Sequence, residues 1–243
     1  MRIALLSDVH GNLPAFKAVL ADVENEGVDE RWCLGDLVGY GAEPDDCVNL
    51  ARETCTVCLA GNHDLVVTQE IPISDFSSSA AAAALWTREN ITAEALAFLR
   101  GRPASDPARE PGLYHGSPRD PVWEYVLSAW QADECMDLMS GRVAAIGHSH
   151  VALWFGRDPT GKVGGDQARD GDKADLTAGE WLINPGSVGQ PRDGDPRAAW
   201  LLLDTEGWTA RWRRVEYPIE EAAGAIEKAG LPRVLAERLY SGQ

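Results

Sequence analysis

Short apolar runs alternate with helix-like segments through the first two-thirds of this 243-residue chain. Residues 3–6 (IALL) suit a strand, and apolar residues then recur at helical spacing over 13–23. The segments 31–36 and 55–61 are typical of further strands, with a helical pattern over 44–53 between them. Strands that alternate with helices predict a layered α/β fold.

The rest of the chain extends this pattern within a single domain, which we expect to cover residues 1–243. A helical segment near the cleft is predicted over 74–101, and a Gly- and Asp-rich stretch over 156–179 is interpreted as a flexible loop or hairpin tip. The other predicted elements are strands at 112–116, 143–150 and in 180–217, and helices at 131–141, 219–229 and 232–240.

The charge balance limits the partners that the chain can bind. Lys and Arg number 22 against 38 Asp and Glu, which gives a formal charge of −16 and argues against nucleic-acid binding. No apolar run is long enough for a signal peptide or a membrane span, so we expect a cytoplasmic protein without membrane contact. The five scattered cysteines fit buried thiols in a reducing compartment, and the single CxxC at Cys55 and Cys58 is a weak sign of zinc or redox chemistry.

Polar residues follow the predicted strands at the point where each strand ends. Asp8 and His10 come directly after the first apolar run. In an extended segment residues i and i+2 point to the same side, so these two side chains should converge on one point. The carboxyl ends of strands form the ligand-binding edge of an open α/β sheet, and the following loops should therefore meet there. The residues in those loops are Asp8, His10, Asp36, Asn62, His63, Asp64, His115, His148 and His150.

All five histidines of the chain lie in these strand-end loops, each close to a glycine. One histidine beside an apolar run is usually a structural residue, but five at one sheet edge are hard to explain in that way. Glycine permits a sharp turn or a close approach of the backbone to a ligand. Imidazole and carboxylate donors suit Mn, Fe, Zn or Ni.

Five short blocks, DVH, GD, GNHD, HGS and GHSH, follow one another in this order over residues 8–150. Together they resemble the calcineurin-like metallophosphoesterase superfamily. The segments AALWTREN and NPGSVGQPRDGDPRAAW resemble the small bacterial and archaeal phosphoesterases within it, so the similarity covers nearly the whole chain. The resemblance implies an α/β four-layer αββα sandwich, in which helices flank two mixed sheets, with two divalent metal ions at the sheet edge.

The resemblance also implies a role for each matching residue. Asp8, His10 and His150 would hold the first metal, and Asn62, His115 and His148 the second. The carboxylate of Asp36 would bridge the two ions.

The implied reaction is attack on phosphorus by a hydroxide that bridges the metals. His63 resembles the histidine that protonates the leaving oxygen or stabilises the transition state. Asp64 is its neighbour and is expected to orient the imidazole ring.

Four further residues are candidates for substrate binding, each with an alternative. Asn12 is a donor near the metals or a helix N-cap, and Tyr40 lines the cleft or packs in its loop. Arg192 and Arg197 clamp a phosphate or a base, or else they pair with neighbouring aspartates.

These observations favour a dinuclear metal-dependent phosphoesterase that acts on a small phosphorylated substrate, with a slight preference for a phosphodiester or nucleotide. Phosphoprotein or dinucleoside polyphosphate phosphatases are alternatives. A non-catalytic metal-binding scaffold would lack His63 or Asp36, and both are present. A nucleic-acid exonuclease is disfavoured by the charge. The sequence leaves the oligomeric state, the metals and the substrate open.

Overall fold

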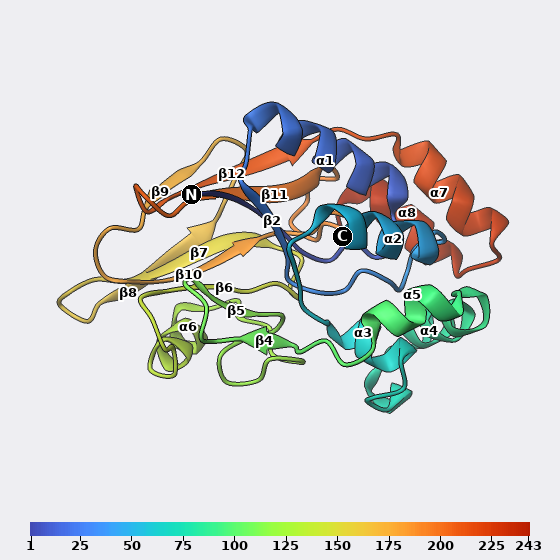
Figure 1. The fold of residues 1–243 in the computed structure, drawn as a ribbon, viewed down its shortest axis with the longest axis horizontal. Coiled ribbons are helices and arrows are strands. Elements are labelled where there is room, and N and C mark those ends of the chain that lie inside the picture. Colours follow the sequence, from blue (N-terminus) through green and yellow to red (C-terminus); the bar gives the residue numbers. More distant parts are fainter.

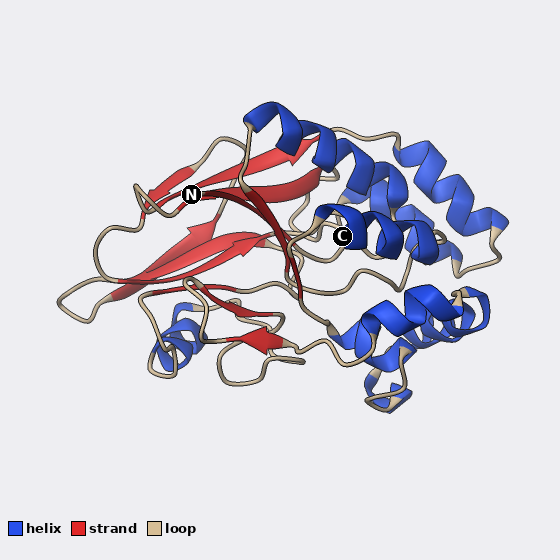
Figure 2. Ribbon diagram, viewed as in Figure 1, coloured by secondary structure: helices blue, strands red, loops and turns tan.

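The computed structural model describes residues 1–243 and contains two six-stranded sheets (Figures 1 and 2). The first sheet has the order β3-β2-β1-β11-β12-β9, and the second has the order β4-β5-β6-β10-β7-β8. Each sheet is mixed, since β1 pairs in parallel with β2 and antiparallel with β11, and β10 pairs in parallel with β6 and antiparallel with β7.

The strands of the first sheet are β1 (Arg2–Leu6), β2 (Glu30–Cys33), β3 (Val57–Cys58), β9 (Lys173–Asp175), β11 (Ala198–Asp204) and β12 (Thr209–Val215). Those of the second are β4 (Ser105–Asp106), β5 (Gly112–Tyr114), β6 (Val143–Ala145), β7 (Ala152–Arg157), β8 (Val163–Gln167) and β10 (Glu180–Pro185). The helices are α1 (Leu13–Glu26), α2 (Pro44–Thr54), α3 (Asn62–Val67), α4 (Ser78–Asn90), α5 (Ala93–Leu99), α6 (Ala129–Met136), α7 (Ile219–Lys228) and α8 (Arg233–Ser241), with a 3₁₀ turn, η1 (Ile73–Asp75).

Helices cover the outer face of each sheet. In Figure 1, α1, α7 and α8 lie with α2 over the first sheet, and α6 lies beneath the second. Buried side chains of α1 and α8 share a core with β1 and β11, and those of α6 share another with β6, β7 and β10. The layers therefore follow the order helix, sheet, sheet, helix, as predicted.

The alternation of residues along β1 shows why this strand lies in the middle of the molecule. Ala4 and Leu6 belong to the core under the helices, whereas Ile3 and Leu5 belong to the core between the sheets. All four side chains are fully buried. A strand with both faces buried is a continuous apolar run, which is what residues 3–6 are.

Most predicted elements are present, but several strands end earlier than expected. The strand predicted over 31–36 is Glu30–Cys33, and the one over 55–61 is only Val57–Cys58. The strand over 143–150 stops at Ala145. In each case the next residue (Leu34, Leu59 or Ile146) still donates to the neighbouring strand, and the chain then forms a loop.

Residues 156–179 are not one flexible loop, whereas the alternative interpretation as a hairpin tip holds for the turn between β7 and β8. β8 pairs with β7 as the outermost strand of the second sheet, and β9 pairs with β12 as the outermost strand of the first. The segment therefore joins the edges of the two sheets. The sequence VGGDQ hides this role because it has almost no apolar side chains, and an edge strand of this kind is held by its backbone hydrogen bonds.

The longest helix, α1, has 14 residues. No helix has the length and apolar character that crossing a membrane requires.

We predict that Leu203→Ala destabilises the protein by about 2–5 kcal/mol, because Leu203 is fully buried between the sheets and its truncation leaves a cavity. Leu138→Ala is the matched control, since that leucine is 57% exposed, and it should change stability by about 0.5 kcal/mol or less. Urea unfolding of both variants measures the difference. Equal losses would contradict the inter-sheet core.

Candidate metal centre

The loops that follow β1, β2 and β3 of one sheet meet the loops that follow β5 and β6 of the other. The backbone N–H of His148 donates to Asp8 Oδ2 at 3.1 Å, which joins the β6 loop to the β1 loop. The His115 ring lies against the backbone carbonyl of Leu34 at 3.0 Å, which joins the β5 loop to the β2 loop. The predicted convergence of the strand-end residues is thereby confirmed.

The backbone that achieves this convergence is left-handed rather than extended. Asp8, His10, Asp36, His148 and His150 all have φ between 52° and 63°. The prediction that Asp8 and His10, and likewise His148 and His150, share a side because their segments are extended is therefore wrong. A non-glycine residue in the left-handed region costs free energy, and such residues gather where the surroundings force a functional geometry.

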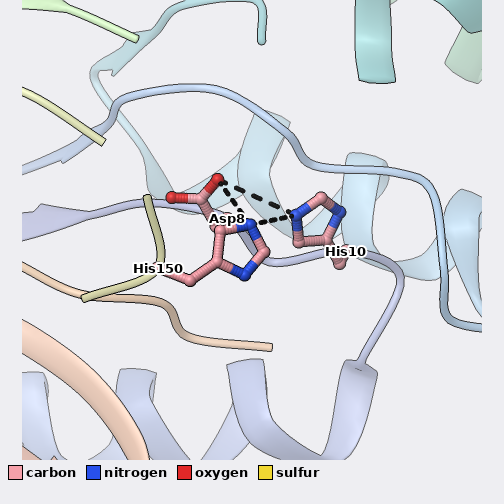
Figure 3. Close-up of side chains that lie close together, drawn as sticks. All are labelled: Asp8, His10 and His150. Carbon is pink, nitrogen blue, oxygen red and sulfur yellow. Dashed lines mark hydrogen bonds and ion pairs between the residues drawn. The ribbon is translucent and has the colours of Figure 1, made fainter. Parts of the chain in front are cut away.

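One cluster contains Asp8, His10 and His150 (Figure 3). The Nε2 atoms of the two histidines face each other at 3.1 Å, and Asp8 Oδ1 lies 3.3 Å from His150 Nε2. The opposite ring nitrogen of each histidine contacts a carbonyl oxygen, that of Val38 at 3.0 Å and that of Gln190 at 2.6 Å. A carbonyl only accepts, so each Nδ1 carries the proton and each Nε2 presents a lone pair.

A second cluster contains Asp36, His115 and His148, with Asn62 beside it. His115 donates from Nδ1 to the Leu34 carbonyl, so its Nε2 lone pair lies 3.1 Å from Asn62 Oδ1 and 3.5 Å from Asp36 Oδ2. His148 uses the other nitrogen for its support, since Nε2 donates to the carbonyl of Trp123 at 3.2 Å. Its Nδ1 is left for the cluster.

Both clusters bring imidazole nitrogens and carboxylate oxygens together, and this arrangement fits a cation. Asp8 Oδ1 and Asp36 Oδ2 are buried and accept no hydrogen bond. Buried acceptors left unpaired in this way are costly. Asp36 Oδ2 lies 3.7 Å from His10 Nε2 and 3.5 Å from His115 Nε2, so its carboxylate stands between the clusters. Nitrogen and oxygen donors of this kind suit divalent transition metals.

The electrostatics of the site match this donor role. Burial lowers the pKa of all five histidines, well below the ordinary value for His10, His63 and His148, and neighbouring imidazoles add to the effect. Each ring is thus neutral and able to donate a lone pair. Burial and the nearby charges of Asp64 and Asp8 raise the pKa of Asp36 well above its usual range, so a bound cation would displace a proton there.

His63 lies in the first turn of α3, beside the clusters. Its backbone N–H donates to Asp36 Oδ1 at 2.8 Å, whereas its ring Nδ1 is buried without a hydrogen-bond partner. The ring packs between Tyr40 and Phe76, with centroids 4.3 and 4.5 Å away. Gly39 makes room for it, because a Cβ at that position would come within 2.3 Å of His63 Nδ1.

The prediction that Asp64 orients the His63 ring is wrong. The Asp64 carboxylate instead accepts the backbone N–H groups of Asp36, Val38 and Gly61 at 2.8, 3.2 and 3.0 Å. It therefore ties the loop after β2 to the start of α3. Burial raises its pKa to about 6 despite these hydrogen bonds.

A cleft of about 310 Å³ opens over the two clusters. Tyr40 and Arg192 line it, and the Arg192 guanidinium donates to Tyr40 Oη at 3.2 Å. The lining residues are Asp36, Tyr40, Asn62, His63, Asp75, Phe76, Ser77, Ala80, Trp123, Tyr125, His148, His150, Arg192 and Arg238. Asp75, Phe76, Ser77 and Ala80 come from the start of the segment 74–101, in which the first helix, α4, begins at Ser78.

Two of the predicted substrate contacts are instead structural. Arg197 pairs with Asp195 at 2.7 Å and does not line the cleft. Asn12 caps α1, where its Oδ1 accepts from Ala15 N–H at 3.1 Å, and its amide donates to the Gly189 carbonyl at 2.8 Å. Both polar ends of Asn12 are thereby used.

Seven cleft residues are not among the site residues predicted from the sequence: Asp75, Phe76, Ser77, Ala80, Trp123, Tyr125 and Arg238. Phe76, Trp123 and Tyr125 lie in stretches without regular periodicity, and Arg238 lies in the last helix, 46 positions after Arg192. The Tyr125 ring stacks on His148 with centroids 4.2 Å apart and planes 10° apart. No sequence pattern ties these residues to the metal-binding blocks.

Comparison with known proteins decides the family. A sequence model described as the calcineurin-like phosphoesterase superfamily domain matches residues 1–207. The chain belongs to this superfamily. Accordingly it is a metal-dependent phosphoesterase, as the five blocks implied.

Relatives of this phosphoesterase share its full length. An uncharacterized protein of Methanocaldococcus jannaschii is 38% identical over 249 residues, which cover 99% of this chain and 98% of the relative. The crystal structure of a metallophosphoesterase from Sphaerobacter thermophilus is 36% identical, with a TM-score of 0.88 and coverage of 100% and 99%. A hypothetical protein of Pyrococcus horikoshii has the same fold at 21% identity, with a TM-score of 0.79 and coverage of 100% and 98%.

We predict that the metal-free phosphoesterase loses stability as the pH falls below about 6.5. The unfolded chain binds protons on its histidines near that pH, whereas the folded chain keeps five of them neutral because their pKa values are lowered. Asp36 and Asp64 act in the opposite direction, because their raised pKa values favour the folded form at low pH. The five histidines outnumber these two carboxylates, so the net effect is a loss of stability. Each group contributes about 1.4 kcal/mol per pH unit while it titrates in one state only.

Urea midpoints in the presence of a chelator at pH 5, 6, 7 and 8 measure this dependence. The midpoint should fall steeply between pH 6.5 and 5 and change little above pH 7. A midpoint that is constant or higher at pH 5 would contradict five buried neutral imidazoles.

We also predict that Asp64→Asn destabilises the protein by about 2–4 kcal/mol, since an amide accepts fewer of the three buried backbone N–H groups. Metal affinity should fall with it, because Asp36 loses its backbone support. Asp46→Asn, at an exposed site on α2, is the control. Thermal unfolding with and without Mn²⁺ measures both effects, and an Asp64→Asn protein as stable as the control would refute the assignment.

Proposed function

We propose that this phosphoesterase is dinuclear and hydrolyses small phosphodiesters, with nucleotides as the preferred class. The observation that carries the proposal is the pair of clusters on either side of the Asp36 carboxylate, which is positioned for donation to both. Asp8, His10 and His150 would hold one cation, and the second set would hold the other. That second set is Asn62, His115 and His148.

When bound, two divalent cations supply Lewis acidity toward the phosphate oxygens and an activated water. The chain supplies the rest. The Nδ1–H···O=C bonds to Val38 and Gln190 fix the imidazoles of His10 and His150, so that no ring has to reorient during the reaction. Burial excludes bulk water, which strengthens each electrostatic contact with the phosphate.

His63 is the group that protonates the leaving oxygen. Its ring lines the cleft, and its Nδ1 has no partner within the protein. In the free protein burial lowers the pKa of His63, so that the ring is neutral, and an anionic phosphate placed beside it would raise that pKa. Proton donation to the departing alkoxide follows from this position.

The cleft favours a small organic ester over a phosphoprotein. Its volume of about 310 Å³ lies at the lower end of small-molecule sites. Phe76 and Trp123 stand edge to face across 5.9 Å, and Tyr125 adds a third aromatic side chain. Such surfaces bind a planar base by stacking. The same size speaks against the phosphoprotein alternative, whereas dinucleoside polyphosphates would need to extend beyond the cleft.

We predict that metal-stripped protein hydrolyses neither bis-p-nitrophenyl phosphate nor a dinucleoside monophosphate, and that Mn²⁺, Ni²⁺ or Zn²⁺ restores both activities. His63→Ala should lower kcat/KM by roughly 100-fold or more for the dinucleoside monophosphate, whose alkoxide needs a proton. The loss should be smaller for the p-nitrophenyl ester, because p-nitrophenolate leaves without protonation.

Glu89→Ala on the exposed surface of α4 serves as the control and should match the parent enzyme. Metal content measured on each protein, with two ions per chain expected, tests the dinuclear assignment separately. Equal losses on both esters would refute His63 as the proton donor. Failure to turn over either ester with two metals bound would favour the scaffold hypothesis.

A further inference from the structure

Two arginines line the cleft in addition to the metal-binding residues. Arg192 lies in the loop after β10, and Arg238 lies on α8, near the carboxyl end of the chain. Arg238 falls outside residues 1–207, the part matched by the family model. It is therefore a cleft residue that the superfamily domain itself does not supply.

Neither arginine has a carboxylate partner. Arg192 donates to Tyr40 Oη and to Gln190 Oε1, at 3.2 and 3.0 Å, and its Nε is buried without any partner. Arg238 makes no ion pair, although its neighbour on the same helix, Arg233, pairs with Glu237 at 3.0 Å. Acidic residues outnumber basic ones in this chain by 38 to 22, so that most arginines can find a carboxylate partner. Two arginines without such a partner in one cleft therefore need an explanation.

A single phosphate at the clusters does not need both of these groups. The metal ligands and His63 already face it from the floor of the cleft. The planar guanidinium fork suits a phosphate, to which it donates two parallel hydrogen bonds. Asp75 is the carboxylate of the cleft that lies outside the clusters, and it is exposed, so that solvent and salt screen its repulsion.

We propose that Arg192 and Arg238 form a second anion subsite, which binds a phosphate other than the one that is cleaved. Phe76 and Trp123 line the same cleft, so the substrate class is a nucleotide that carries two separate phosphate groups. This inference rests on the proposed function, which accounts for the cleaved phosphate. It adds a second phosphate as the part of the substrate that the cleft recognises.

The test compares two ligands that differ only in the second phosphate. Calorimetry on the metal-loaded protein gives Kd for thymidine 5′-monophosphate and for thymidine 3′,5′-bisphosphate. We expect the bisphosphate to bind about tenfold more tightly or better, and Arg238→Ala to remove most of that ratio. Arg238→Lys keeps the charge and should retain part of it.

Arg233→Ala is the matched control, since it removes an arginine from the exposed side of the same helix, where Arg233 is 81% exposed. It should keep the full ratio. Both ligands are measured on one preparation, so a partly unfolded variant lowers the number of sites without changing the ratio of the two Kd values.

Equal affinity of the parent protein for the two ligands would overturn the subsite, as would a preference that survives Arg238→Ala. Turnover of thymidine 5′-(p-nitrophenyl phosphate) is measured beside the binding. A protein that prefers the bisphosphate but hydrolyses nothing would contradict the proposed function and leave the subsite standing. Turnover by a protein that does not prefer the bisphosphate would support the proposed function and contradict the subsite.

Discussion

The hydrogen bonds between imidazole rings and backbone carbonyls determine which ring nitrogen of each histidine is free to bind a ligand. Val38, Leu34 and Gln190 each accept from the Nδ1–H of a buried histidine, and Trp123 accepts from the Nε2–H of His148. Because a carbonyl has no proton to give, these contacts select one tautomer for each ring. The unprotonated nitrogens that result all face the two clusters. The site is therefore suited to binding a cation.

The arrangement of these donor residues costs free energy, and packing in the two sheets offsets that cost. Five donor residues adopt positive φ, and two carboxylate oxygens are buried without a hydrogen bond. Each feature is unfavourable alone. They persist because the loops are short continuations of strands whose faces are fully buried, and because Asp64 accepts three backbone N–H groups at their centre. Cations bound by these donors would offset part of this cost, because they would pair with the two buried oxygens.

The sequence predicts a layered α/β fold and the polar residues after its strands, because both depend on patterns that are local. The four-layer order and the assignment of each metal ligand come instead from the resemblance of the five blocks to the superfamily. The apolar run 3–6 and the polar residues after it are visible in one stretch, and the structure brings those residues together as expected. The errors arise where local patterns do not decide. Extended geometry was inferred for Asp8 and His10, although the strand ends at Leu6, and β8 was missed because its partner β7 determines its pairing. The roles of Asn12 and Asp64 depend on which backbone groups lie nearby, which side-chain identity does not reveal.

The site has a floor and a wall that come from different parts of the fold. The floor consists of strand-end loops that the inter-sheet core holds from below, so that a change there would disturb both sheets. The wall comes from η1, from the irregular stretch around Trp123 and from α8, which pack on the outside of the sandwich. No wall side chain ligates the clusters, but the Tyr125 ring stacks on His148 and the Phe76 ring packs on His63. Trp123 belongs to both parts, because its backbone carbonyl fixes His148 while its side chain faces the cleft. Movement of that stretch would therefore alter substrate contact and metal geometry together.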